Sequence, residues 1–480
     1  MYRLRGTDAQ FIYNETHTSP FVTLKVMIYE PVDPAITPSC SEITQFIIRG
    51  MSGLGIRGIP LRVVRVPLDL HHPVWVFDPA FNGEDHIHHV ALPQPGDKQA
   101  LCQFISNILS TPLDPNRPPW HLWAVEGLQH GRIALIAKVH HVLADGMMSA
   151  QAIATIHEQG DKVQSVPISF PRVKASAHPG RLGLTGRAFI DLIKSYTVEL
   201  PTYYRLLKQK RLARKGMQSP GKSACGPFMA PFTFLNKPGG QHRLYRYETL
   251  PLGQFKRLAK VLGCTINSLV MGICSEALRR YFLEVDSLPS TPLVAVMPVG
   301  VDREKEIKTF LSTDFYNNSV TVAFVPLDLN IVDFRARLHA IQEGSRSAIE
   351  HLRATDGIRM DNFADFLPGS FFRLLAVVQA WRQKKRKSPF ANLSISNVAG
   401  PRQPLYACNG KLKMVELLSA GNLGDPVNLT VTVWSYVDNL CFSCLYRKDA
   451  IPEPERFNSH IVDIYRQLCL EYLPDDQVKA

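Results

Sequence analysis

The chain has 480 residues, of which 45% are hydrophobic and 20% charged, a balance typical of a folded protein that argues against extensive disorder. Its formal net charge of +12 favours anionic partners, among which lipid headgroups, nucleotide phosphates and nucleic acid all qualify. No run reaches about 18 consecutive apolar residues and the N-terminus lacks the apolar region of a signal peptide, so we expect an intracellular protein without a transmembrane helix.

In the first part of the chain, stretches with helical spacing alternate with short strand-like stretches. The pattern predicts helices over residues 8–13, 40–56 and 98–110, an alternating strand over 22–29, and strand and loop over 73–93. Prolines and an asparagine fix residues 112–120 as an ordered loop. That loop leads into a strand over 121–127 and a hairpin partner that begins at Ile133 and ends in a histidine pair.

The histidine pair belongs to the stretch KVHHVLADG, residues 138–146, which lies between the buried strand and a helix beginning near Met147. Adjacent side chains of an extended segment point to opposite faces, so one of His140 and His141 faces a cavity while the other packs behind it. A neutral imidazole accepts a proton near pH 7. Asp145 could cap the helix, pair with an arginine or orient a histidine, and Gly146 suits a tight bend. We interpret the stretch as a general base on a rigid platform; the plainer interpretation is two core histidines and a helix cap.

Neither the other histidines nor the cysteines predict a metal site. His86, His88 and His89 lie in a strand and loop where no complete ligand set is close in sequence, and alternation would put His89 opposite the other two. The nine cysteines are scattered in apolar surroundings, which indicates buried thiols in a reducing compartment. Cys441 and Cys444 have zinc-ligand spacing but lie in an alternating strand, where residues three apart point to opposite faces.

The composition changes after the helix that follows the histidine pair. Residues 160–185 are rich in Gly, Pro and Ser, and a basic helix is predicted near 186–215, either as a solvated face or as a contact with lipid headgroups. The second half then predicts strands over 243–248, 292–298, 318–324, 392–397 and 427–445, and helices near 252–262, 266–281, 331–353 and 453–472. Both halves therefore mix strands and helices, which is the α/β class.

Residues 371–381 form a strongly apolar helix that ends in the basic run 382–387. An apolar helix with an aromatic residue and a basic end suits contact with a membrane surface. A core helix with a solvated tail is the equal alternative. Nucleic-acid binding is not expected, because the basic residues lack a matching recognition motif.

The histidine stretch resembles the HHxxxDG signature of CoA-dependent acyltransferases and peptide-synthetase condensation domains. An ordered set of further segments is similar to the bacterial wax ester synthase/diacylglycerol acyltransferase family and spans nearly the whole chain. These segments are residues 7–13, 73–75, 89–93 and 112–115 with Trp120, then 298–299, Asn318, 396–401 and 430–436.

This resemblance implies two domains of the chloramphenicol-acetyltransferase type, with mixed sheets flanked by helices and an active-site channel at their interface. We place the N-terminal domain at 1–175, a crossover linker with the basic helix at 176–232, and the C-terminal domain at 233–480. Donors for the developing oxyanion are expected from the second half, with Asn267, Asn318, Ser396 and Asn397 as candidates.

The resemblance also implies acyl transfer from acyl-CoA to diacylglycerol or a fatty alcohol. The alcohol attacks directly, with His141 as general base, His140 beside it, and Asp145 and Gly146 shaping the turn. Acyl-CoA is then a substrate, and no cofactor or metal is implied. We expect a cytoplasmic protein with peripheral contact to the inner membrane face or to lipid bodies, in an oligomeric state that the sequence leaves open.

Three departures from the family's pattern leave alternatives open. Pro119 stands where the family has Leu, Ser268 where it has Asp, and Asp302 where it usually has Arg. The first stiffens a loop. The other two allow a weak acyltransferase or a lipid-surface protein that keeps the fold, and an enzyme for another lipid or polyketide hydroxyl is a further alternative.

Overall fold

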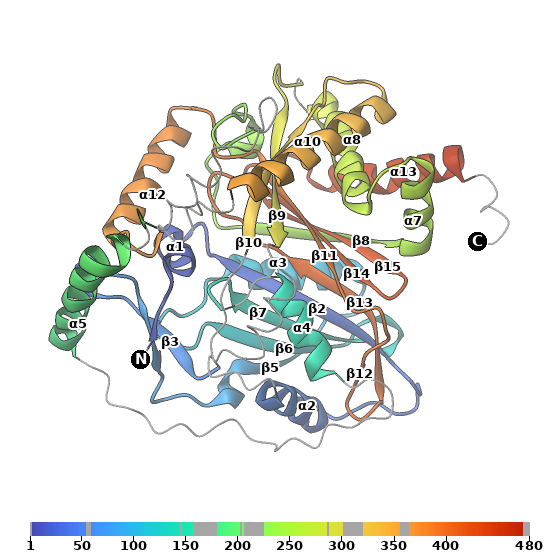
Figure 1. Cartoon of the computed structure of the whole chain (residues 1–480). Coiled ribbons are helices and arrows are strands. Elements are labelled where there is room, and N and C mark those ends of the chain that lie inside the picture. The colour runs from blue at the N-terminus through green and yellow to red at the C-terminus, as the bar shows by residue number, and fades with distance from the viewer. Residues whose placement is uncertain are drawn as a thin grey trace.

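Two six-stranded mixed sheets form the frame of the molecule in the computed structural model (Figure 1). Both halves of the chain combine strands and helices, so the predicted α/β class is confirmed. The structure describes residues 2–53, 59–143, 146–157, 180–201, 204–205, 225–285, 288–300, 320–355 and 364–473.

The first sheet contains strands from both ends of the chain. In spatial order they are β12 (Tyr406–Ala407), β13 (Leu412–Ala420), β2 (Val22–Pro31), β7 (Ile133–His140), β6 (Trp120–Glu126) and β5 (Ile87–Ala91). Only the β5–β6 pair is parallel. Strand β2 lies where the alternating pattern predicts it, but its first eight residues are buried on both faces, because the sheet is covered on both sides.

The pairing of β13 with β2 was not predicted. No strand was assigned to residues 406–420, yet Leu417 pairs with Met27 and Ser419 with Lys25 in an antiparallel ladder. The predicted C-terminal domain, 233–480, therefore contributes two strands to the sheet built from the first part of the chain.

Helices cover both faces of the first sheet. Helices α2 (Cys40–Gly53) and α4 (Gly146–Ile156) contact each other, and apolar residues of both, Phe46 and Ile153 among them, belong to one core with strands of this sheet. Residues Leu101 and Ile105 of α3 (Lys98–Ser110) pack into a second core with Val26 and Ile136. Helix α1 (Gly6–Asn14) lies beside a small sheet of β1 (Tyr2–Arg3), β4 (Val74–Phe77) and β3 (Leu61–Val64).

The second sheet comes entirely from the second half of the chain. In order, its strands are β10 (Val320–Leu327), β9 (Leu293–Gly300), β11 (Leu393–Ala399), β14 (Leu429–Tyr436), β15 (Asn439–Arg447) and β8 (Arg243–Pro251). Its outer face is covered by α7 (Leu252–Val261), α8 (Ile266–Val285), α10 (Phe334–Thr355) and α13 (Glu455–Tyr472) (Figure 1).

Two further helices lie together at one edge of the molecule. Helix α5 (Arg181–Lys194) is the described part of the predicted basic helix; it begins earlier than predicted, and most of residues 202–215 lie outside the described part of the chain. Helix α12 (Gly369–Lys384) is the predicted apolar helix. Both contact the short turn Pro67–Asp69 (Figure 1).

Among the described helices, none has by itself the length and apolarity needed to cross a membrane. Helices α7 and α8, which are bent by 92° relative to each other, are long and apolar enough when taken together, by length and composition only.

The outer edge of β8 is capped by hydroxyl groups of α3. Ser106 Oγ accepts the Tyr245 N–H at 2.9 Å and donates to the Cys102 carbonyl at 2.7 Å, and Ser110 Oγ accepts the Arg243 N–H at 2.9 Å. An edge strand otherwise presents unpaired N–H groups. A helix of the first half thus completes the hydrogen bonding of the second sheet.

Replacing Ser106 with alanine should lower the free energy of unfolding by about 1–3 kcal/mol, because the buried Tyr245 N–H loses its acceptor. Urea unfolding measures this change. Ser459→Ala is the matched control, since Ser459 is exposed and its hydroxyl bonds only within its own helix, so its effect should stay within about 0.5 kcal/mol. Equal losses in the two variants would contradict the capping role.

Candidate active site

Strand β7 delivers the two histidines to a fixed position at its end. His140 pairs with Val22 of β2, and its N–H donates to the Pro119 carbonyl at 2.9 Å. The His141 N–H donates to the Phe21 carbonyl at 2.8 Å. The backbone of both residues is therefore held from the two sides of the strand.

His140 is buried and acts within the fold. Its Nδ1 accepts the Val142 N–H at 3.1 Å, so its ring proton lies on Nε2, which is 3.4 Å from Glu15 Oε2. Burial raises the pKa of Glu15. The His140 imidazole and the Phe21 N–H, which donates to Glu15 Oε1 at 3.2 Å, lower that pKa by more than burial raises it, so the net shift is downward. Sequence analysis missed Glu15, because nothing in its own neighbourhood links it to the histidine pair.

His141 is partly exposed, as alternation along an extended segment predicts. Its ring stacks on Phe11 of α1, with centroids 4.4 Å apart and planes 26° apart. Burial lowers the pKa of His141 to about 4, and the positive charge of Lys25 acts in the same direction. The imidazole is consequently neutral at pH 7 and able to accept a proton.

Lys25 is a buried cation between the two sheets that sequence analysis also missed. Its ammonium group donates to Thr23 Oγ1 at 3.0 Å and to Ser419 Oγ at 2.8 Å, and lies 5.1 Å from the ring centroid of Trp434. It therefore contacts β2, β13 and β14 together. A lysine in an alternating strand is ordinarily assigned to the solvent face, whereas here Ser419 of β13 and Trp434 of β14 enclose it.

Two of the predicted oxyanion donors lie on β11 of the second sheet. Ser396 and Asn397 are partly buried and pair with Thr432 and Val433 of β14. Helix α4, which follows the histidine stretch, contacts β11. The fold thus brings the helix of the motif against the strand that carries both candidates.

The remaining predicted residues have different outcomes. Gly146 is the first residue of α4. Asn267 lies at the start of α8, and its Nδ2 donates to Met297 Sδ of β9 at 3.0 Å. Asp145 and Asn318 lie outside the described residues, so their predicted roles stay predictions.

Two of the three departures can be located. Ser268 is buried and lies in the first turn of α8, where its N–H donates to Thr265 Oγ1 at 3.0 Å and the two hydroxyls are 2.9 Å apart. This arrangement caps the helix. The Pro118–Pro119 pair supports His140 directly through the Pro119 carbonyl. Asp302 lies outside the described residues.

The other histidines separate as predicted. His88 Nε2 lies 2.9 Å from His121 Nδ1, and the ring of His86 also stacks on His121, whereas His89 contacts Thr44 of α2 instead. All nine cysteines are free.

The cysteine predictions are confirmed in part. Cys441 packs into the core shared with α3 and Cys444 into the core of the second half, so they point to opposite faces of β15. Contrary to the expected burial of the thiols, Cys40 is exposed, and three others are only partly buried: Cys225, Cys264 and Cys469.

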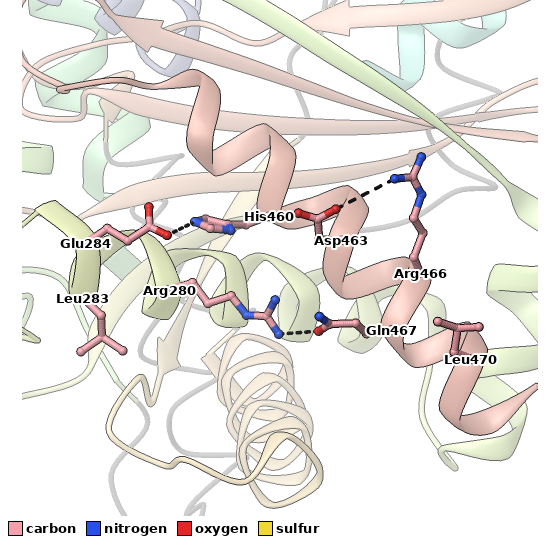
Figure 2. Close-up of a pocket in the computed structure, with 8 residues that line it drawn as sticks. All are labelled: Arg280, Leu283, Glu284, His460, Asp463, Arg466, Gln467 and Leu470. Carbon is pink, nitrogen blue, oxygen red and sulfur yellow. Dashed lines mark hydrogen bonds and ion pairs between the residues drawn. The ribbon is translucent and has the colours of Figure 1, made fainter.

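A surface groove of about 590 Å³ lies between α8 and α13 (Figure 2). Its charged groups largely satisfy one another: His460 Nε2 is 3.1 Å from Glu284 Oε1, and Arg280 donates to Gln467 at 2.7 Å. The groove contains none of the predicted site residues and lies on the outer layer of the second half. Its lining residues are Arg280, Leu283, Glu284, His460, Asp463, Arg466, Gln467 and Leu470.

Comparisons with known proteins agree over both halves. Residues 4–270 match the model of the wax ester synthase/diacylglycerol acyltransferase catalytic domain, and residues 316–468 match the C-terminal domain of the same family. A Mycobacterium tuberculosis protein, whose name assigns it provisionally to the diacylglycerol O-acyltransferases, is 30% identical over 92% of each chain. The O-acyltransferase WSD of Acinetobacter baylyi is 28% identical over 81% of each chain.

Solved structures show the same fold. A wax ester synthase/diacylglycerol acyltransferase from Marinobacter aquaeolei VT8 superimposes with a TM-score of 0.67 at 24% identity, covering 98% of this chain and 99% of that one. A trichothecene 15-O-acetyltransferase from Fusarium sporotrichioides gives a TM-score of 0.60 at 13% identity, covering 97% and 94%.

The His141 imidazole should titrate near pH 4, and Lys25→Met should raise its pKa while leaving it below the ordinary value of about 6.5. The reason is that removing a nearby positive charge favours the protonated ring, whereas burial, the larger effect, remains. Titration of carbon-13-labelled histidine by NMR measures both values. In Lys98→Met, which removes an exposed lysine on α3, the His141 pKa should not change. An unchanged His141 pKa in Lys25→Met would contradict the influence assigned to Lys25.

Proposed function

The chain belongs to the wax ester synthase/diacylglycerol acyltransferase family, and from this membership we propose that His141 is the general base of its acyl transfer. The protein is an acyl-CoA-dependent O-acyltransferase, and its acceptors are diacylglycerol or a fatty alcohol. The observation that carries the role of His141 is a neutral, partly exposed imidazole at the end of β7, in the motif that the family match includes.

The chemistry needs one base that takes up a proton and then releases it, and no covalent enzyme intermediate. As the acceptor oxygen attacks the thioester carbon, the imidazole of His141 takes the hydroxyl proton, so that a neutral alcohol becomes an effective nucleophile. The new C–O bond forms, the C–S bond breaks, and the proton passes from the imidazolium to the departing CoA thiolate. The products are an ester and free CoA.

His140 and Glu15 are positioning residues in this scheme. Their contact, together with the Val142 N–H, fixes the strand end from which the base projects. Ser396, Asn397 and Asn267 are the described candidates for stabilising the oxyanion, because hydrogen-bond donors aimed at developing charge lower the barrier. Lys25 adds positive charge to the same environment and lowers the pKa of the His141 imidazole in addition to burial, which is the larger cause.

Replacing His141 with alanine should reduce ester formation from a long-chain acyl-CoA by at least about 100-fold, because general base catalysis contributes roughly that much or more. Release of CoA and formation of ester measure the reaction with diacylglycerol, a fatty alcohol and an unrelated hydroxyl acceptor in parallel. His130→Ala, in an exposed turn, is the matched control and should retain full activity.

Circular dichroism and thermal unfolding establish that the His141 variant is folded. Full activity in the folded variant would refute the role of the base. Turnover of only the third acceptor would assign the enzyme to another hydroxyl substrate, and no turnover with any of them would support a catalytically weak member.

We further propose that α5, α12 and the turn Pro67–Asp69, which both helices contact, dock on a lipid surface. Many large apolar side chains here are exposed, including Leu374 at 60%, Val377 at 65%, Trp381 at 54% and Leu182 at 90%. Exposed apolar residues in this number mark an interaction surface. The basic residues at the end of α12, Arg382, Lys384, Lys385, Arg386 and Lys387, suit anionic headgroups.

Helix α1 lies between this surface and His141 and contacts both. Phe372 of α12 stacks on Tyr13 of α1 with ring centroids 5.6 Å apart, and Phe11 of α1 stacks on His141. A lipid acceptor would thus be taken up next to the site that uses it. We place the enzyme on the cytoplasmic face of the membrane or on lipid bodies.

The double variant Leu374→Asp with Val377→Asp should bind anionic phosphatidylglycerol vesicles at least about tenfold more weakly, because burying each apolar side chain contributes roughly 1.5–3 kcal/mol. Vesicle co-sedimentation measures this. Val332→Asp, at a 73% exposed apolar residue outside this surface, should bind like the parent. Equal binding by all three proteins would reject the docking surface without bearing on His141.

A further inference from the structure

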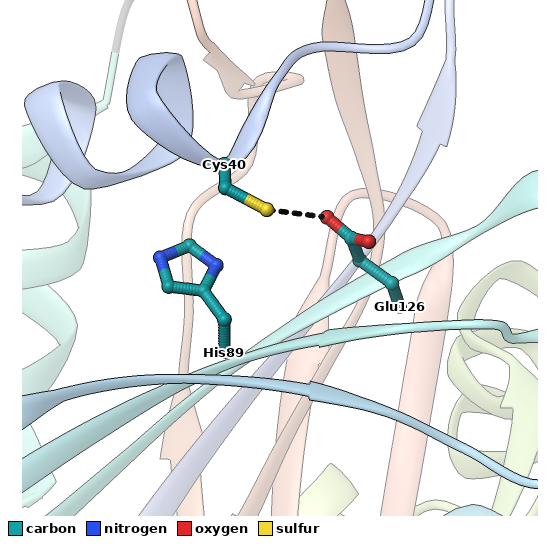
Figure 3. Close-up of side chains that lie close together, drawn as sticks. All are labelled: Cys40, His89 and Glu126. Carbon is teal, nitrogen blue, oxygen red and sulfur yellow. Dashed lines mark hydrogen bonds between the residues drawn. The ribbon is translucent and has the colours of Figure 1, made fainter.

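Three metal-binding side chains from three elements converge at the edge of the first sheet (Figure 3). Cys40 is the first residue of α2, His89 is the central residue of β5, and Glu126 is the last residue of β6. One potential ligand atom from each lies within 4.8 Å of the other two, and Cys40 Sγ is 3.6 Å from Glu126 Oε1.

The spacing is close to that of a tetrahedral zinc site. Zinc bonds of about 2.3 Å to sulfur and about 2.0–2.2 Å to nitrogen and oxygen put neighbouring ligand atoms roughly 3.3–3.6 Å apart. The thiol and the carboxylate already have this separation. Because Cys40 and His89 are exposed and Glu126 is partly exposed, small side-chain rotations can bring the third ligand in.

His89 is oriented by a second contact. Its Nε2 lies 2.9 Å from Thr44 Oγ1, one helical turn beyond Cys40 in α2. When that nitrogen donates to the hydroxyl, the other ring nitrogen keeps a free lone pair, and Figure 3 shows it on the side of the thiol and carboxylate. Metal-binding histidines usually have their second nitrogen held in this way.

We propose that Cys40, His89 and Glu126 bind a divalent transition metal, with Zn²⁺ the best match to one sulfur, one nitrogen and one oxygen ligand. Coordination requires the thiolate, so the Cys40 proton is released to solvent on binding. Three protein ligands leave a fourth position for water.

The position of the site separates it from the proposed acyl transfer. Glu126 lies at the far end of β6 from Trp120, and Trp120 pairs with Val139 beside the histidine pair. The metal would tie α2 to β5, the edge strand of the sheet, away from His141. Sequence analysis predicted no metal here because the three ligands are distant in sequence and only the fold brings them together.

Cobalt titration of the full chain, stripped of metal with a chelator, tests the proposal. We expect one Co²⁺ per chain, with a thiolate-to-cobalt charge-transfer band and tetrahedral d–d bands that Zn²⁺ abolishes, and a rise in the unfolding temperature with Zn²⁺. Cys40→Ala should remove the charge-transfer band. His89→Ala and Glu126→Gln should each weaken binding at least about tenfold.

Cys264→Ala removes a half-buried thiol of the second half and should bind cobalt like the parent, and so should His141→Ala. The proposal is overturned if the parent gives no charge-transfer band or if Cys40→Ala binds unchanged. Several weak equivalents insensitive to all three substitutions would likewise overturn it, as adventitious surface binding.

Discussion

The antiparallel pairing of β13 with β2 is the constraint on which the arrangement of the site depends. β2 lies next to β7, whose end carries the histidine pair, and β13 belongs to the half that carries the oxyanion candidates. Because this ladder runs from Leu412 to Ala420 with one register shift between Met414 and Glu416, the two halves cannot rotate against each other without breaking its hydrogen bonds. The position of His141 relative to β11, which carries Ser396 and Asn397, therefore depends on strand register.

Two other features reinforce this constraint. The hydroxyls of α3 complete the edge of β8, and Trp434 and Tyr436 of the second sheet belong to the same core as α2 and β7. Lys25 lies where these elements meet, held by Ser419 of β13 and facing Trp434. The positive charge of Lys25 adds to the burial of His141 itself in lowering the pKa of the His141 imidazole.

The amino-acid sequence predicts those features of the fold and the candidate site that depend on the pattern of neighbouring residues along one strand. The strand that ends in the histidine pair, the opposite exposure of His140 and His141, and the opposite faces of Cys441 and Cys444 all follow from two-residue periodicity. Strand β13 was missed because its partner lies in the first part of the chain.

The site residues that were missed share this cause. Glu15 contacts His140, which is distant in the sequence, and Lys25 is enclosed by Ser419 of β13 and Trp434 of β14. Nothing in the surrounding residues of either one marks it as part of the site, since the informative contact is tertiary in both cases.

Helix α1 connects the chemistry to the exposed apolar surface. Phe11 and Tyr13 are two residues apart, and one stacks on the base while the other stacks on α12. The close approach of α12 requires glycine, because a Cβ at Gly369 would collide with the Tyr13 ring. A displacement of α12 on a lipid surface would thus be transmitted to α1 by direct packing, and α1 is the element that supports the His141 ring. The aromatic pair therefore links the proposed docking surface and the proposed general base through one helix.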